Sequence, residues 1–174
     1  MKRPLDIWTQ GCDIRDLIVW GRVYKDWVSK AMQQYGQKLE MKGQTAIFVD
    51  LSGPAQRSLS LLSVLCQQLA RCVTPEPPGL PAVGDDDAKC QQFLMHFEDC
   101  LDEGVVITVM MTNVPHYLFS KNGAGFAMLR LLLESARFRN WWHTSAKPIL
   151  QELDSKVTMH MIHDLTVRTG ARED

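Results

Sequence analysis

The stretch VVITVMM, residues 105–111, decides the fold class of this chain. All of its side chains except that of Thr108 are apolar, so a strand built from it presents apolar groups on both faces. Antiparallel strands commonly have one face in water, whereas parallel strands in α/β proteins are covered by helices on both faces. We therefore expect Val105–Met111 to be a central strand of a parallel sheet between layers of helices.

Strand-like and helix-like segments alternate on either side of this stretch. The other segments that suit strands are residues 16–20, 45–50 and 156–163. Helical spacing of apolar residues is found at about 27–39, 58–72, 87–101 and 124–136, with a short helix near 148–153. This alternation predicts a single α/β domain over residues 1–174. Its fold would be a three-layer doubly wound sandwich, a mostly parallel sheet of four or five strands with helices on both faces.

Residues 73–87, VTPEPPGLPAVGDDD, are the one low-complexity stretch of the chain. They contain four prolines, two glycines and three aspartates. Such a composition is typical of a long exposed loop, and we expect one here. Asp87 at its end is expected to cap the helix that follows.

Composition and charge exclude several classes of protein. The formal net charge of -1 argues against a general polyanion binder. The longest apolar runs are too short to cross a bilayer, and the N-terminal residues lack the apolar region of a signal peptide. The five cysteines include no C-x-x-C pair, so we expect reduced thiols and no zinc site. The sequence thus predicts a cytoplasmic protein without membrane contact, metal or cofactor.

The order of the segments resembles the core of P-loop NTPases of the AAA and STAND kind. The runs that carry the resemblance are LIVWG (17–21), TAIFVDLSG (45–53), VVITVMMTNVPHYLF (105–119), AMLRLLLESARF (127–138) and KVTMHMIHD (156–164). In that family a phosphate-binding loop follows the first strand, and a later strand bears the aspartate that binds the metal. The resemblance implies an NTPase-like fold over about residues 16–164.

The residues that carry the chemistry of that family differ in this chain. A phosphate loop reads G-x-x-x-x-G-K-[ST], because its glycines let backbone N–H groups surround the phosphates and its lysine neutralises them. Residues 21–28 read GRVYKDWV, so Asp26, Trp27 and Val28 occupy the last three positions. Thr112 and Asn113 stand where the metal-binding aspartate is expected. We predict no hydrolysis by the usual mechanism, and a degenerate NTPase-like domain (a pseudo-ATPase) retained for binding.

A second family resemblance concerns two strand ends. The run FVDLSGP (48–54) is similar to the D-x-S-x-S strand end of von Willebrand factor A domains, and ITVMMTNVP (107–115) looks like their T-D-G strand end. The resemblance implies Asp50, Ser52 and Thr112 as oxygen ligands of a divalent cation such as Mg²⁺. Pro54 and Asn113 stand where that family has Ser and Asp. Alternatively, Asp50 and Ser52 shape a turn after a strand, because such side chains bond to their own backbone.

Our leading functional hypothesis is a non-catalytic domain that works through protein–protein contact, as a regulator or an assembly component. A protein partner or a homo-oligomer is expected. The predicted surface is Arg137, Arg139, Trp141 and Trp142, because Arg and Trp are enriched at interface hot spots. The same residues would suit stacked bases and phosphates, although the net charge disfavours nucleic acid. Alternatively, the rings end a helix and fill the core.

The second hypothesis is a small-ligand or nucleotide-binding enzyme with a non-standard site. Ligands of open α/β sheets bind beyond the carboxyl ends of the strands. The residues expected there are Gly21, Lys25, Asp50, Ser52, Thr112, Asn113 and His116. This hypothesis requires these groups to converge at one edge of the sheet.

Overall fold

A parallel sheet forms the centre of the molecule. The computed structural model describes residues 16–21, 27–52, 62–119, 124–149 and 157–161. The five strands have the order β2-β3-β4-β1-β5, and all neighbouring pairs are parallel. They are β1 (Asp16–Trp20), β2 (Thr45–Asp50), β3 (Ile107–Thr112), β4 (Phe138–Thr144) and β5 (Thr158–Met161).

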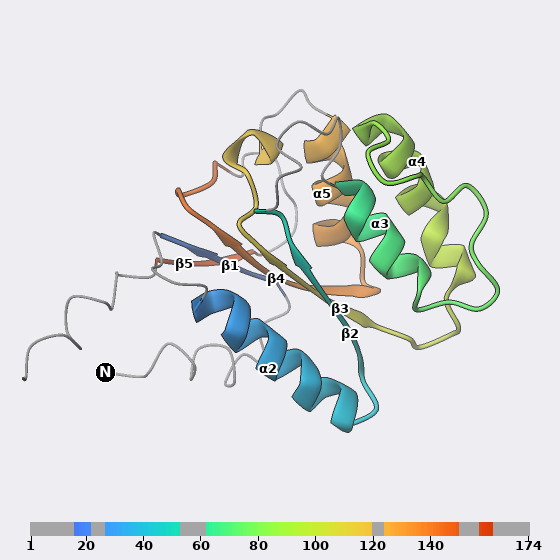
Figure 1. The fold of residues 1–174 in the computed structure, drawn as a ribbon, viewed down its shortest axis with the longest axis horizontal. Helices are drawn as coiled ribbons and strands as arrows, with labels where there is room; N and C mark the ends of the chain where they lie inside the picture. Colours follow the sequence, from blue (N-terminus) through green and yellow to red (C-terminus); the bar gives the residue numbers. More distant parts are fainter. Residues whose placement is uncertain (1–15, 22–26, 53–61, 120–123, 150–156, 162–174) are drawn as a thin grey trace, which may run out of the picture.

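Helices cover both faces of this sheet, as Figure 1 shows. On one face lies α2 (Trp27–Met41), and on the other lie α3 (Leu62–Ala70), α4 (Asp87–Phe97) and α5 (Ala124–Glu134). Two short 3-10 turns, η3 (Glu98–Cys100) and η4 (His116–Phe119), complete the elements. The α/β sandwich expected from the sequence is therefore confirmed. Within the described ranges, none of the helices has the length and apolar character needed to cross a membrane.

Alternate residues of β1, β2, β3 and β4 supply two separate cores. Towards α3, α4 and α5, the larger cluster includes Ile18, Val109 and Trp142. Towards α2, the smaller cluster includes Leu17 and Trp141. Because successive side chains of a strand point to opposite faces, the adjacent indoles of β4 fall into different clusters. Both rings have an exposed fraction of 0%.

Strand β4 is the element that the sequence did not predict. The run FRNWWHT contains Arg, Asn and His, which interrupt both an apolar run and a simple alternation. It is nevertheless a central strand that pairs with β1 on one side and with β3 on the other. The predicted helix near 148–153 lies largely outside the described residues, as do residues 58–61 of the helix that contains α3.

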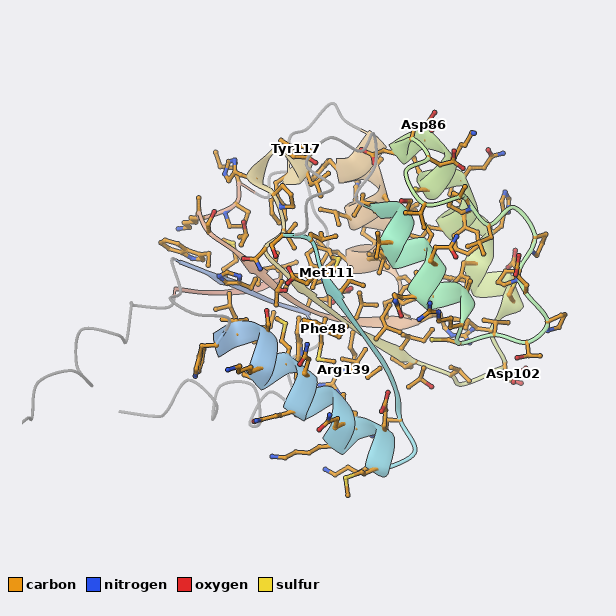
Figure 2. All side chains as sticks on the ribbon, in the orientation of Figure 1. Phe48, Asp86, Asp102, Met111, Tyr117 and Arg139 are labelled. Atoms are coloured by element: carbon orange, nitrogen blue, oxygen red, sulfur yellow. The ribbon has the colours of Figure 1, made fainter. Side chains whose placement is uncertain are left out.

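The proline-rich segment 73–86 is held against α3. The Gln67 side chain donates a hydrogen bond to the carbonyl oxygen of Pro81 at 2.7 Å, and the Gly84 N–H donates to Ser63 Oγ at 2.8 Å. The cap of α4 is Asp86, one residue earlier than predicted, and its side chain accepts from the Lys89 N–H at 2.9 Å. Figure 2 labels Asp86 at the start of α4.

Candidate functional site at the carboxyl-terminal edge of the sheet

The connections of the sheet change face at the carboxyl end of β1. The chain that follows β1 continues into α2 on one face, whereas the chain that follows β2 and β3 passes through helices on the other face. Such a switch point opens a crevice in which doubly wound proteins bind their ligands. In this sheet the crevice is expected beside Gly21, between β1 and its neighbour β4. Gly21 has φ +140°, a conformation that glycine adopts without strain.

Asp50 places a carboxylate at this edge, at the end of β2. Its Oδ1 accepts hydrogen bonds from the Ser52 N–H at 2.9 Å and from the Asn113 side-chain amide at 3.1 Å. Partial burial alone would raise the pKa of Asp50, but hydrogen bonds from Ser52, Asn113 and Thr112 outweigh it and lower the pKa below its usual value. Asp50 is therefore an exposed, ionised carboxylate in a fixed orientation.

Asn113 connects β2 with β4. It follows β3 with φ +54°, a left-handed conformation that Asn tolerates better than most residues. Its side chain bonds to Asp50, and its N–H donates to Nδ1 of His143 at 3.4 Å. Such backbone conformations recur at binding and catalytic sites, where the surrounding structure holds them in place.

His143 continues the connection to β1. Its Nε2 lies 3.0 Å from the carbonyl oxygen of Gly21. Because Nδ1 accepts from Asn113, we assign the proton to Nε2, which donates to Gly21 in the neutral ring. Burial lowers the pKa of His143, and the bond to Gly21 opposes this only in part. Both ring nitrogens are engaged, so His143 positions its neighbours and offers no free acid or base.

Hydroxyl groups reinforce the same edge. The Ser29 hydroxyl of α2 lies 3.4 Å from that of Thr112, and both residues are buried. Thr144 Oγ1 donates to the carbonyl oxygen of Val114 at 2.9 Å, and the Gly21 N–H donates to the carbonyl oxygen of Thr144 at 3.0 Å. Hydrogen bonds therefore tie together the ends of β1, β3 and β4.

Most of the residues predicted for a ligand site meet here. Hydrogen bonds that run through His143 join Gly21, Asp50, Ser52 and Asn113, and Thr112 adjoins Asp50. His116 lies in η4, where it is exposed, and it is not part of this series of hydrogen bonds. Lys25 lies outside the described residues. Within those ranges, Asp50 belongs to no group of three or more His, Cys, Asp or Glu side chains that could hold a metal.

The predicted partner surface is corrected by the burial of its tryptophans. Trp141 and Trp142 belong to the two cores and expose no area to a partner. Arg137 is turned to the backbone, where its guanidinium donates to the carbonyl oxygens of Val105, at 2.8 Å, and of Asp102. The Arg139 guanidinium lies 5.7 Å from the centre of the Trp141 ring. The bulk of this predicted surface is thus structural.

His143 was not predicted at the site, because β4 was not recognised from the sequence. One signal was available: aromatic residues favour strands, and an α/β alternation needs a strand after the helix at 124–136.

The hollow of about 500 Å³ that Arg139 lines lies at the opposite, amino-terminal edge of the sheet. Its other lining residues include Gly43, Gln44, Thr45, Gly104 and Thr108. Figure 2 shows Arg139 on the face that carries α2. The hydrogen-bonded residues at the carboxyl-terminal edge and this hollow are therefore separate features.

Comparison with models of known protein families gives no match, and no curated protein sequence matches the chain significantly.

Proposed function

We propose that this chain is a non-catalytic binding domain that holds a small polar ligand at the carboxyl-terminal edge of its sheet, beside β1. The observation that carries this proposal is the continuous chain of hydrogen bonds from Ser52 through Asp50, Asn113 and His143 to Gly21. It lies where doubly wound sheets bind their ligands. Maintaining a fixed carboxylate and a left-handed Asn at this edge has a cost that ligand binding would explain.

The charge at this edge restricts the ligand. Asp50 is ionised and repels phosphate groups unless a cation lies between them. A nucleotide would therefore bind together with Mg²⁺, which prefers oxygen ligands such as those of Asp50 and the nearby hydroxyls. Hydrolysis is not part of the proposal, because GRVYKDWV supplies neither the lysine nor the hydroxyl of a phosphate loop in its usual position.

A thermal-shift titration tests this function. ATP and GTP are added at millimolar concentration, each with and without Mg²⁺, and Mg²⁺ is also added alone. A ligand at a hundred times its Kd stabilises the fold by about 2.7 kcal/mol, so a clear Mg²⁺-dependent rise in Tm is expected. Asp50→Asn should abolish the rise, whereas Asp99→Asn, an exposed carboxylate in η3, should leave it unchanged. A flat response to all these probes would contradict nucleotide binding.

Protein–protein contact is a second candidate function, and a different observation favours it. The outer edge of β2 has no pairing strand among the described residues. We propose this edge as the partner-binding surface, in place of the predicted surface around Trp141 and Trp142.

A further inference from the structure

The hollow of about 500 Å³ at the amino-terminal edge of the sheet has the size of a small-molecule site. It is bounded by the turn that leads into β2, by the turn that leads into β3, and by Arg139 of β4. The hydrogen-bonded residues of the proposed function lie at the opposite edge, so a ligand in this hollow would occupy a second, separate site.

The hollow lies beside the part of the sheet that α2 covers. On this face α2 packs with Met110 of β3 and Trp141 of β4 in the smaller core cluster. Thr108 and Arg139 precede these two residues by two positions in their strands, so they lie on the same face, nearer the amino-terminal ends. Figure 2 shows Arg139 on the face that carries α2. The end of the covered area therefore leaves room for a ligand beside Thr108 and Arg139.

Arg139 gives the hollow a positive charge at a fixed position. Among the described residues that line the hollow, it is the only one with a charge, and the exposed Asp102 and Glu103 do not line it. The guanidinium lies 5.7 Å from the centre of the Trp141 ring, and this contact holds the cation in place. A guanidinium has five N–H donors in one plane, so an anion can bind to it in addition to the contacts that it already makes.

Neutral polar groups and an apolar side chain complete the lining. Thr108 is the register partner of Arg139, so the two side chains lie next to each other on one face of the sheet. Gln44 and Thr45 contribute an amide and a second hydroxyl from the turn before β2. Val106 supplies apolar surface and is 41% exposed. One cation, several neutral hydrogen-bonding groups and an apolar side chain suit an anion that carries an apolar body.

We propose that this hollow binds a small organic monocarboxylate, whose carboxylate pairs with Arg139 and whose apolar body contacts Val106. A carboxylate matches the planar fork of a guanidinium and accepts two parallel hydrogen bonds from it. A phosphate group with two charges would find only one cation in the described lining, so the single charge of a monocarboxylate fits better. The inference does not depend on the proposed function, because the two sites lie at opposite edges of the sheet.

An NMR titration of the full chain with benzoate as the probe tests the proposal. Benzoate should shift the backbone amide signals of Gly104 and Val106, which line the hollow, and the shifts should saturate in the millimolar range. Benzylamine has a similar shape and the opposite charge, and inorganic phosphate has no apolar body. Each should bind about ten-fold more weakly than benzoate or worse, because each lacks one part of the fit.

Variants of the lining identify the residues that bind the probe. Arg139→Met keeps a long side chain without the charge and should weaken benzoate binding about ten-fold or more. Arg139→Lys keeps the charge but not the planar fork, so its affinity should lie between those of the wild type and Arg139→Met. Thr108→Val removes only the hydroxyl and should also lower the affinity. Arg71→Met, which removes an exposed arginine outside this lining, should have no effect.

Three outcomes would overturn the inference. One is a titration in which benzoate leaves the signals of Gly104 and Val106 unchanged. Another is a folded Arg139→Met variant that binds benzoate as the wild type does. The third is equal binding of benzylamine or phosphate, since the hollow would then not select a carboxylate with an apolar body. The dispersion of the amide signals shows whether each variant is folded. If Arg139→Met does not fold, Arg139→Lys decides, and an affinity equal to that of the wild type would contradict the pairing.

Discussion

Gly125 shows how closely the start of α5 packs. A Cβ at this position would lie 2.7 Å from Leu118 Cδ2 and 3.0 Å from Asp87 Oδ2. Leu118 is buried and Asp87 is in the first turn of α4, so neither neighbour moves aside freely. We expect Gly125→Ala to lower the free energy of unfolding by about 1–3 kcal/mol, in spite of the better helix propensity of Ala. Chemical denaturation measures this loss.

Gly36 provides the control for that prediction. Its added Cβ would lie 2.8 Å from Met110 Cε, the far end of a flexible side chain. Alanine in the middle of α2 also gains about 1 kcal/mol of helix propensity. Gly36→Ala should therefore cost clearly less than Gly125→Ala. Equal losses would show that contact with Leu118 and Asp87 does not restrict residue 125.

His143 makes the stability depend on pH. Burial lowers its pKa in the folded state below the ordinary value of 6.5, so the unfolded chain binds the proton more readily. Its contribution is complete above about pH 6.5 and is lost as the pH falls through the lowered pKa, where protonation of Nδ1 also breaks the bond from Asn113. Wild type should lose more stability between pH 8 and pH 5 than His143→Gln does. An equal loss of stability in the wild type and in His143→Gln between pH 8 and pH 5 would contradict this assignment.

At the scale of elements, β4 forms the centre of both cores. Trp142 is fully buried in the larger cluster, so Trp142→Ala should cost about 3–5 kcal/mol of unfolding free energy. Arg139→Ala removes a half-buried side chain at the edge of the same strand, and it should cost about 1 kcal/mol or less. Urea denaturation of the two variants compares these losses. A mild effect of Trp142→Ala would return that ring to the list of candidate surface residues.

The sequence predicted elements well where one physical signal dominated. Residues 45–50 are β-rich and end at a turn signal, and β2 has the same bounds. The apolar spacing at 27–39 predicted a helix, and α2 spans Trp27–Met41. Strand β4 was missed because a strand buried on both faces has no alternation, and its Arg, Asn and His conceal its burial.

The same reasoning explains which site residues were predicted. Asp50, Thr112 and Asn113 follow recognised strands, and parallel strands bring their carboxyl ends to one edge. His143 belongs to the unrecognised strand, so its bridge to Gly21 could not be anticipated. Trp141 and Trp142 were assigned to a surface because β4 was not recognised. In a strand, neighbouring side chains point to opposite faces of the sheet, and here helices cover both faces.

For the whole molecule, the order of the strands makes the two halves of the chain interdependent. β1 comes first in the sequence, yet its neighbours in the sheet are β4 and β5. A fragment of residues 1–104 would leave both edges of β1 without the partner strands β4 and β5, and we expect it not to unfold cooperatively. Far-UV circular dichroism during urea denaturation tests this. A sigmoidal transition of the fragment would show that α2, β2 and α3 form an independent unit.

The position of β1 also has a consequence for synthesis on the ribosome. Asp16 and Asn140, which bond to each other in the core, are 124 residues apart. At roughly 5–20 residues per second, the run LIVW would wait about 6–25 s before its partner strand emerges. During that time this short apolar segment lacks its partner strand and can associate with other apolar surfaces. We therefore expect the nascent chain to be a client of chaperones that shield apolar segments until β4 has been synthesised.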